Sequence, residues 1–143
     1  MAEILSETDR ALIGALRGNG RASVTELAHG LGLSRTTVKT RLDALVDSGK
    51  IRRFTIETDT DVEGGVRAIT MVELQGSMSR GVIRTLSRLP EVSAIHSTNG
   101  AWDLVVEIRT DSLAAFDLVL RAIRDVPGVV NSESSILLSH VGG

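Results

Sequence analysis

Apolar positions in the first third of the chain recur every three or four residues, the period of an amphipathic helix. Each apolar run follows a serine. Ser6 and Ser23 are followed three residues later by the acids Asp9 and Glu26, a spacing typical of a capping box, and Ser34 can cap a third helix. Glycines at the ends of these runs stop each helix. The pattern predicts three helices, whose inward residues are Leu12, Ile13, Leu16, Leu27, Ala28, Leu31, Val38, Leu42 and Leu45.

The two later helices are separated only by Gly32-Leu33-Ser34. Ala28 is small enough for two crossing helices to approach closely, and Gly32 can adopt the positive φ of a tight turn. This spacing is typical of a helix-turn-helix. An ordinary helical hairpin with a glycine turn is the alternative.

Apolar and polar residues alternate over 51–56, which predicts a short strand that would form a wing. Residues 57–65 are acidic and end in Gly-Gly, which favours a linker over a surface loop within one domain because the period changes across them.

Beyond this segment, strand and helix patterns alternate. We expect strands at 66–74, 92–97, 102–109 and 129–141, a helix at 79–89, and a second helix that begins at Asp111 or Ser112 and stops at Pro127-Gly128. The order β-α-β-β-α-β is that of a ferredoxin-like domain. The predicted fold is therefore α+β, with a winged helix-turn-helix at 1–56, a linker at 57–65 and a ferredoxin-like domain at 66–143. The open sheet face of so small a domain would be buried against a second copy.

The third helix carries the residues that point to DNA. With Val38 inward, its outer side begins with hydroxyls and cations that suit base edges and phosphates, and its acids Asp43 and Asp47 come later. An ordinary solvated helix face is the alternative, as a cationic edge strand is for the wing. Arg41 falls near the inner boundary of the helix. The predicted DNA contacts are Ser34, Arg35, Thr36, Thr37, Lys39, Thr40, Arg41, Lys50, Arg52 and Arg53.

Charge supports this division and composition excludes other classes. The net charge of −2 comprises +3 in residues 1–56, −4 in 57–63 and −1 in the rest. The absence of cysteine excludes disulfides, and His29, His96 and His140 show no ligand spacing, so we expect no metal or cofactor. No set of acid, base and nucleophile indicates an enzyme. Without a long apolar run or a signal peptide, a cytoplasmic location is expected.

Several segments together resemble the leucine-responsive/asparagine-type (Lrp/AsnC) transcription regulators. Residues 5–13 are similar to the first helix of that family, and residues 19–42 to its helix-turn-helix. Gly49 to Phe54 resemble its exit strand, and residues 99–104 its signature of a glycine followed three residues later by aspartate. Residues 126–129 and 132–134 are similar to the entry to its last strand.

The resemblance implies a DNA-binding regulator that dimerises through the open sheet, often assembles into octamers, and responds to an amino acid. By position, the effector would contact Thr98, Asn99, Gly100, Asp103, Ser132 and Ser134. Turn N–H groups can hold a carboxylate and Asp103 an ammonium. Alternatively, Gly100 only makes a tight hairpin and Asp103 pairs with a surface arginine. An amino-acid-binding module without DNA function remains the second functional hypothesis.

Overall fold

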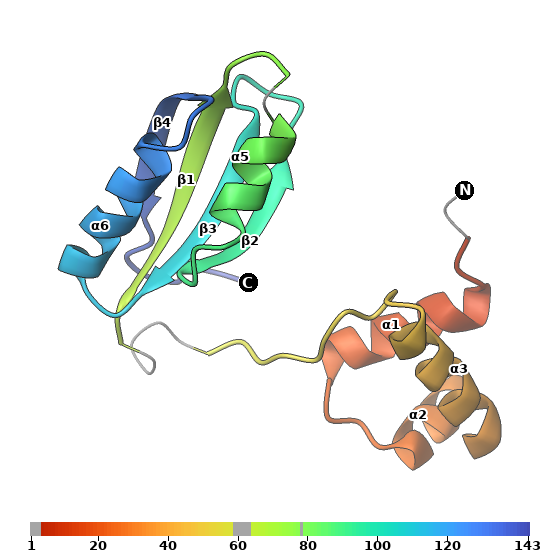
Figure 1. The fold of residues 1–143 in the computed structure, drawn as a ribbon. Coiled ribbons are helices and arrows are strands. Elements are labelled where there is room, and N and C mark those ends of the chain that lie inside the picture. Colours follow the sequence, from red (N-terminus) through yellow and green to blue (C-terminus); the bar gives the residue numbers. More distant parts are fainter. Residues whose placement is uncertain (1–3, 59–63, 78) are drawn as a thin grey trace. The chain divides into compact units, whose positions relative to one another are not determined.

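The computed structural model describes residues 4–58, 64–77 and 79–143, which belong to two compact units, Met1–Glu57 and Thr58–Gly143 (Figure 1). The division falls at the start of the predicted linker, 57–65. Positions 59–63 of that linker lie outside the described residues.

The first unit contains three helices: α1 (Glu7–Gly18), α2 (Val24–Leu31) and α3 (Arg35–Asp47). Both predicted capping boxes are confirmed. The Ser6 hydroxyl accepts the Asp9 N–H at 3.1 Å, and the Ser23 hydroxyl accepts the Glu26 N–H at 3.1 Å. In return the Ser23 N–H donates to the Glu26 carboxylate at 2.7 Å, which lowers the pKa of Glu26 below its usual value. These caps fix where α1 and α2 begin.

The helices of the first unit pack around Leu12, Leu27, Ala28 and Val38, all buried as predicted. Gly32 ends α2 with φ +64°, and the Leu33 N–H donates to the Ala28 carbonyl at 2.9 Å. The glycine turns the chain within three residues, because a left-handed backbone costs a glycine little. This turn sets α3 across α2 in the helix-turn-helix arrangement.

The predicted strand at 51–56 is wrong. Residues 52–58 have no regular secondary structure, and Phe54 and Ile56 are 55% and 76% exposed. The Ile51 N–H instead donates to the Leu45 carbonyl at 2.9 Å, which folds the chain back onto the end of α3. The alternation was present, but a strand also needs a neighbouring strand to pair with its backbone, and the described part of the first unit has none.

The second unit follows the predicted order: β1 (Val66–Leu74), α5 (Ser79–Leu86), β2 (Val92–Ser97), β3 (Leu104–Thr110), α6 (Leu113–Arg124) and β4 (Val129–Ile136). The sheet has the strand order β2-β3-β1-β4, and each neighbouring pair is antiparallel. Both helices cover the same sheet face (Figure 1). This is the ferredoxin-like arrangement.

The two sheet faces divide as the alternation in β1 predicts. Ala68, Thr70 and Val72 are buried beneath the helices, whereas Ile69 and Met71 lie half-buried on the face without helices. The helices contribute five buried apolar side chains to the core: Val82, Leu86, Phe116, Val119 and Ile123.

Several element ends differ from prediction. The helix predicted to reach Leu89 ends at Leu86, because the Leu89 N–H donates to the Leu86 carbonyl three residues earlier and closes a tight turn. The last strand ends at Ile136 rather than 141, since its register with Ala68 leaves β1 only two more residues to pair. Ser112, not Asp111, caps α6.

Candidate nucleic-acid interface and effector site

The N-terminal half of α3 presents an exposed polar surface. All six predicted contacts from Ser34 to Thr40 are exposed, while Val38 between them is completely buried. The Ser34 hydroxyl accepts the Thr37 N–H at 3.0 Å and lies 2.8 Å from the Thr37 hydroxyl. The structure therefore brings together one set of side chains, the α3 surface: Ser34, Arg35, Thr36, Thr37, Lys39 and Thr40.

Lys39 has a partner on its own helix. Its ammonium lies 3.2 Å from the Asp43 carboxylate, one turn later, and both side chains are well exposed at 71% and 60%. Exposed pairs of this kind contribute little stability because water competes for both charges. Lys39 can therefore exchange Asp43 for a phosphate at small cost.

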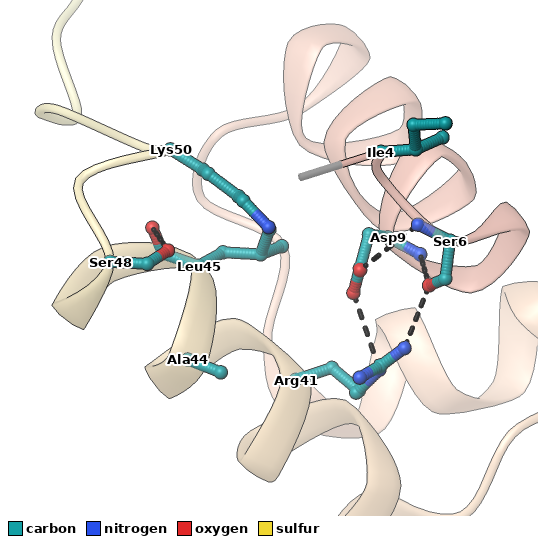
Figure 2. A pocket seen from close by; sticks show the side chains of 8 residues that line it. All are labelled: Ile4, Ser6, Asp9, Arg41, Ala44, Leu45, Ser48 and Lys50. Carbon is teal, nitrogen blue, oxygen red and sulfur yellow. Dashed lines mark hydrogen bonds and ion pairs between the residues drawn. The ribbon is translucent and has the colours of Figure 1, made fainter. Parts of the chain in front are cut away.

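Arg41 points towards Ser6 and Asp9 at the start of α1 (Figure 2). Its Nε lies 3.3 Å from Asp9 Oδ1, and its Nη2 donates to the Ser6 hydroxyl at 2.7 Å. Asp9 is one of two buried polar residues among those described. Arg41 therefore joins α3 to the capped start of α1, so this predicted DNA contact lies apart from the others. The position of Arg41 at the inner boundary of the predicted helix was the sequence signal for a contact within the protein.

A cavity of about 310 Å³ lies beside this ion pair. Lys50 lines it together with residues of α3 and the start of α1 (Figure 2). Arg52 and Arg53 follow in the irregular segment and are exposed. Arg52 and Arg53, which the prediction placed on the wing strand, and Lys50 just before it are thus not held by a strand. The cavity is lined by Ile4, Ser6, Asp9, Arg41, Ala44, Leu45, Ser48 and Lys50.

Thr98, Asn99 and Gly100 form an exposed connection between β2 and β3. The Thr98 hydroxyl donates to the Trp102 carbonyl and accepts the Gly100 N–H at 3.3 Å. The Thr98 N–H donates to the Asp103 carbonyl at 3.0 Å. The hairpin is therefore braced from within by Thr98.

Asp103 is fixed to the end of β1. Its carboxylate accepts the Leu74 N–H at 2.7 Å, and its own N–H donates to the Val72 carbonyl at 3.0 Å. The register between β1 and β4 shifts at Leu74, so this N–H lies where the ladder is interrupted. Asp103 thus bonds a backbone N–H, where the alternative interpretation expects a surface arginine.

Ser132 and Ser134 lie on β4, across β1 from the hairpin. They pair with Val72 and Thr70. The Ser134 hydroxyl lies 2.8 Å from that of Thr70, which is completely buried. Within one chain, the predicted effector contacts on the β2–β3 hairpin and those on β4 therefore lie on opposite sides of β1. The sequence-based prediction did not include Thr70 as the partner of Ser134. A hydroxyl at an inward position of a strand was the available sign that this residue needs a polar partner.

Within 4–58, 64–77 and 79–143, no three acidic, histidine or cysteine side chains gather where they could hold a metal ion. No helix in those ranges has the length and apolar character that a membrane span requires.

An exposed helix on a helix-turn-helix, followed by an α+β domain, is an arrangement typical of DNA-binding transcription regulators. Family comparisons agree. Residues 5–52 match the winged helix-turn-helix DNA-binding model, and residues 67–142 match the Lrp/AsnC ligand binding domain. The chain belongs to the Lrp/AsnC family of transcription regulators.

Relatives match along nearly the whole length. The transcriptional regulator LysM of Saccharolobus solfataricus is 30% identical over 135 residues, which cover 94% of each chain. The leucine response regulatory protein of Mycobacterium tuberculosis is 25% identical, with a TM-score of 0.80 over 97% of this chain and 96% of that one. A Neisseria meningitidis regulator solved with L-Met has a TM-score of 0.76 at 24% identity, covering 98% of this chain and 94% of that one.

Proposed function

We propose that this regulator binds duplex DNA sequence-specifically through the α3 surface, and that an amino acid bound by the second unit modulates its assembly or DNA affinity. The observation that carries the first half is the exposed, acid-free start of α3, with Arg35 and Lys39 among four hydroxyl side chains. The helix N-terminus adds N–H groups that favour a phosphate.

Within this interface, Arg35 and Lys39 are the cations that can reach base edges or phosphates, and the α3 hydroxyls hydrogen-bond to either. Arg52 and Arg53 contribute phosphate contacts from the irregular segment that follows, and Lys50 remains a candidate from the edge of the cavity. The domain limits 1–56, 57–65 and 66–143 remain our proposed boundaries. The cytoplasm, where the chromosome lies, is the proposed location.

The test of DNA binding compares Arg35→Ala with Arg10→Ala, which removes an exposed arginine from α1. After operator selection from a random duplex pool, affinities are measured by fluorescence anisotropy. Arg35→Ala should weaken operator binding by about 1–3 kcal/mol if Arg35 reaches a base, while Arg10→Ala should match the wild type. Equal affinities for all three proteins would remove Arg35 from the interface.

The effector half of the proposal rests on the family's ligand-binding domain and on hairpin chemistry. The exposed hairpin residues Asn99 and Gly100 offer N–H groups to a carboxylate, the Gly100 N–H in exchange for its 3.3 Å bond to the Thr98 hydroxyl. Asp103 offers its charge to an ammonium. Ser132 and Ser134 supply hydroxyls from the other side of β1. The Neisseria regulator of the same fold, solved with L-Met, supports an amino acid as the ligand class.

The variant Asp103→Asn separates effector binding by Asp103 from its hydrogen bond with the Leu74 N–H. Asparagine keeps an oxygen that accepts the Leu74 N–H but loses the negative charge. We expect thermal stability close to the wild type and loss of the response to the effector amino acid. Calorimetry against the twenty amino acids, with light scattering to follow assembly, checks both. Undiminished effector binding by this variant would exclude Asp103 as the ammonium site.

For regulation we propose that a dimer or higher oligomer presents two α3 helices to half-sites about one helical turn, or a multiple of it, apart. An effector that binds one assembly state more tightly shifts the population towards it. A protein that binds amino acids but shows no salt-dependent duplex binding would instead be a ligand-binding module without DNA function.

A further inference from the structure

Three arginines line the outer side of α5 and the turn after it. Arg80 and Arg84 are spaced four residues apart, which places them on one side of α5, and Arg88 follows in the turn after the helix. All three are exposed, while Val82 and Leu86 on the opposite side are buried against the sheet. The Arg88 N–H donates to the Thr85 carbonyl at 3.2 Å, so the turn continues along the helix. We name Arg80, Arg84 and Arg88 the α5 arginine stripe.

Along the sequence, the stripe is separated from acidic residues. Residues 74–90 contain these three arginines and no acid, whereas the rest of residues 64–143 carries four arginines and eight acids. In the described part of the chain, none of the three has an ion pair or a side-chain hydrogen bond. By contrast, Arg121 on α6 lies 2.8 Å from the Asp117 carboxylate.

Two hydroxyls close to the stripe, on Thr85 and Ser87, already donate to backbone carbonyls. The Thr85 hydroxyl donates to the Gly81 carbonyl at 3.0 Å, and the Ser87 hydroxyl donates to the Ile83 carbonyl at 2.7 Å. The three guanidinium groups, which have no ion pair or side-chain hydrogen bond among the described residues, can donate to a partner. Such groups bind phosphate through two parallel hydrogen bonds.

We propose that the α5 arginine stripe binds the phosphate backbone of duplex DNA outside the stretch contacted by α3. Charge complementarity supports this partner, since a duplex is the polyanion that a DNA-binding regulator meets. Four residues of helix rise about 6 Å, close to the roughly 7 Å of duplex axis that separates a phosphate from the next but one on the same strand. The inference rests on the proposed DNA binding and extends it to the second unit.

The test uses the full chain with Arg80→Gln, Arg84→Gln and Arg88→Gln combined. Anisotropy titrations against non-specific duplexes of about 20 and about 60 base pairs, over a salt series, need no known operator. The triple variant should bind the long duplex at least about tenfold more weakly and keep the wild-type affinity for the short one. Its salt slope on the long duplex should fall by about 0.9 for each phosphate that the stripe no longer neutralises.

The matched control combines Arg121→Gln with Arg124→Gln, which removes exposed charge from the other helix. It should retain the wild-type salt slope. An unchanged slope for the triple variant, an equal loss of affinity for both duplexes, or a change in assembled mass by light scattering would each overturn the proposal. The last outcome would assign the stripe to a contact between subunits. Failure of the wild type to bind any duplex would instead refute the proposed DNA binding itself.

Discussion

At the scale of single residues, Arg41 shows how a cation within a recognition helix can have a structural partner. Asp9 is buried next to it, and the Ser6 hydroxyl that caps α1 also accepts from its guanidinium. One side chain thus satisfies a buried carboxylate and holds two helices together. We therefore expect Arg41 to set the orientation of α3 rather than to bind phosphate.

Replacing Arg41 by alanine leaves Asp9 with an unpaired buried charge. We expect the free energy of unfolding to decrease by about 1–3 kcal/mol. The decrease is smaller than for a fully buried ion pair, because water partly reaches Arg41. Urea denaturation measures this decrease. Lys39→Ala, which breaks only the exposed pair with Asp43, should change stability by less than about 0.5 kcal/mol.

The salt dependence of DNA binding distinguishes a positioning role of Arg41 from a phosphate contact. Replacing a positioning residue leaves the salt slope of binding unchanged, whereas removing a cation that neutralises a phosphate reduces the slope by about 0.9. Arg41→Lys retains the charge and should recover part of the stability. A reduced slope for Arg41→Ala at full stability would return Arg41 to the DNA interface.

At the scale of elements, periodicity and capping predicted most of this fold. Serines followed by acids located the starts of α1 and α2, and alternation in β1 assigned its two faces correctly. These signals are local, because a cap or a face depends on residues a few positions apart. The segment 51–56 alternates in the same way yet forms no strand, since pairing depends on a partner that local pattern does not reveal.

The candidate sites were predictable to different degrees. The α3 surface followed from a helical wheel, because Val38 fixes which side is inward. The contacts of Arg41 with Asp9 and of Asp103 with Leu74 could not be predicted, as each joins residues about 30 positions apart through side-chain geometry. The buried pair of Thr70 with Ser134 depends on the register between β1 and β4.

The start of β1 provides a test of close packing between elements. Gly64 and Gly65 both have positive φ, +64° and +84°. A Cβ on Gly65 would lie 2.5 Å from the Thr110 carbonyl oxygen at the end of β3, whereas one on Gly64 would meet nothing within 4 Å. Both alanine variants should be destabilised by about 1–2 kcal/mol from the backbone alone.

Gly65→Ala should be destabilised by about 1–3 kcal/mol more, because the clash with Thr110 involves backbone and forces β1 and β3 to shift. Thermal unfolding of the two variants side by side measures the difference. Equal melting temperatures would show that the junction yields without cost and that β1 is not held against β3 at this point.

At the scale of the whole molecule, the sheet face without helices is the surface we expect to join two copies. Ile69, Met71 and Val105 are half-buried there, and Ile69 and Met71 pair across the sheet with Glu107 and Glu133. A ferredoxin-like unit of this size buries a small core alone, so covering this face would add stability. Two α3 surfaces would then belong to one particle.

Met71→Lys tests this arrangement. The lysine would stand opposite Glu133 on β4, which lets the single chain tolerate the charge. Burying it between two copies would be costly, so we expect the variant to sediment as a monomer while circular dichroism stays unchanged. Leu118→Lys on the exposed side of α6 is the control and should keep the wild-type mass. A Met71→Lys protein of wild-type mass would place the subunit contact elsewhere.

The bracing of the β2–β3 hairpin has a practical consequence. Trp102, whose carbonyl accepts the Thr98 hydroxyl, is the sole tryptophan of a chain without tyrosine. Intrinsic emission excited at the indole band therefore originates next to Asp103, and nowhere else in the molecule. An unlabelled protein thus carries its own optical probe at the hairpin, and a quench or spectral shift on adding a metabolite would report occupancy there directly.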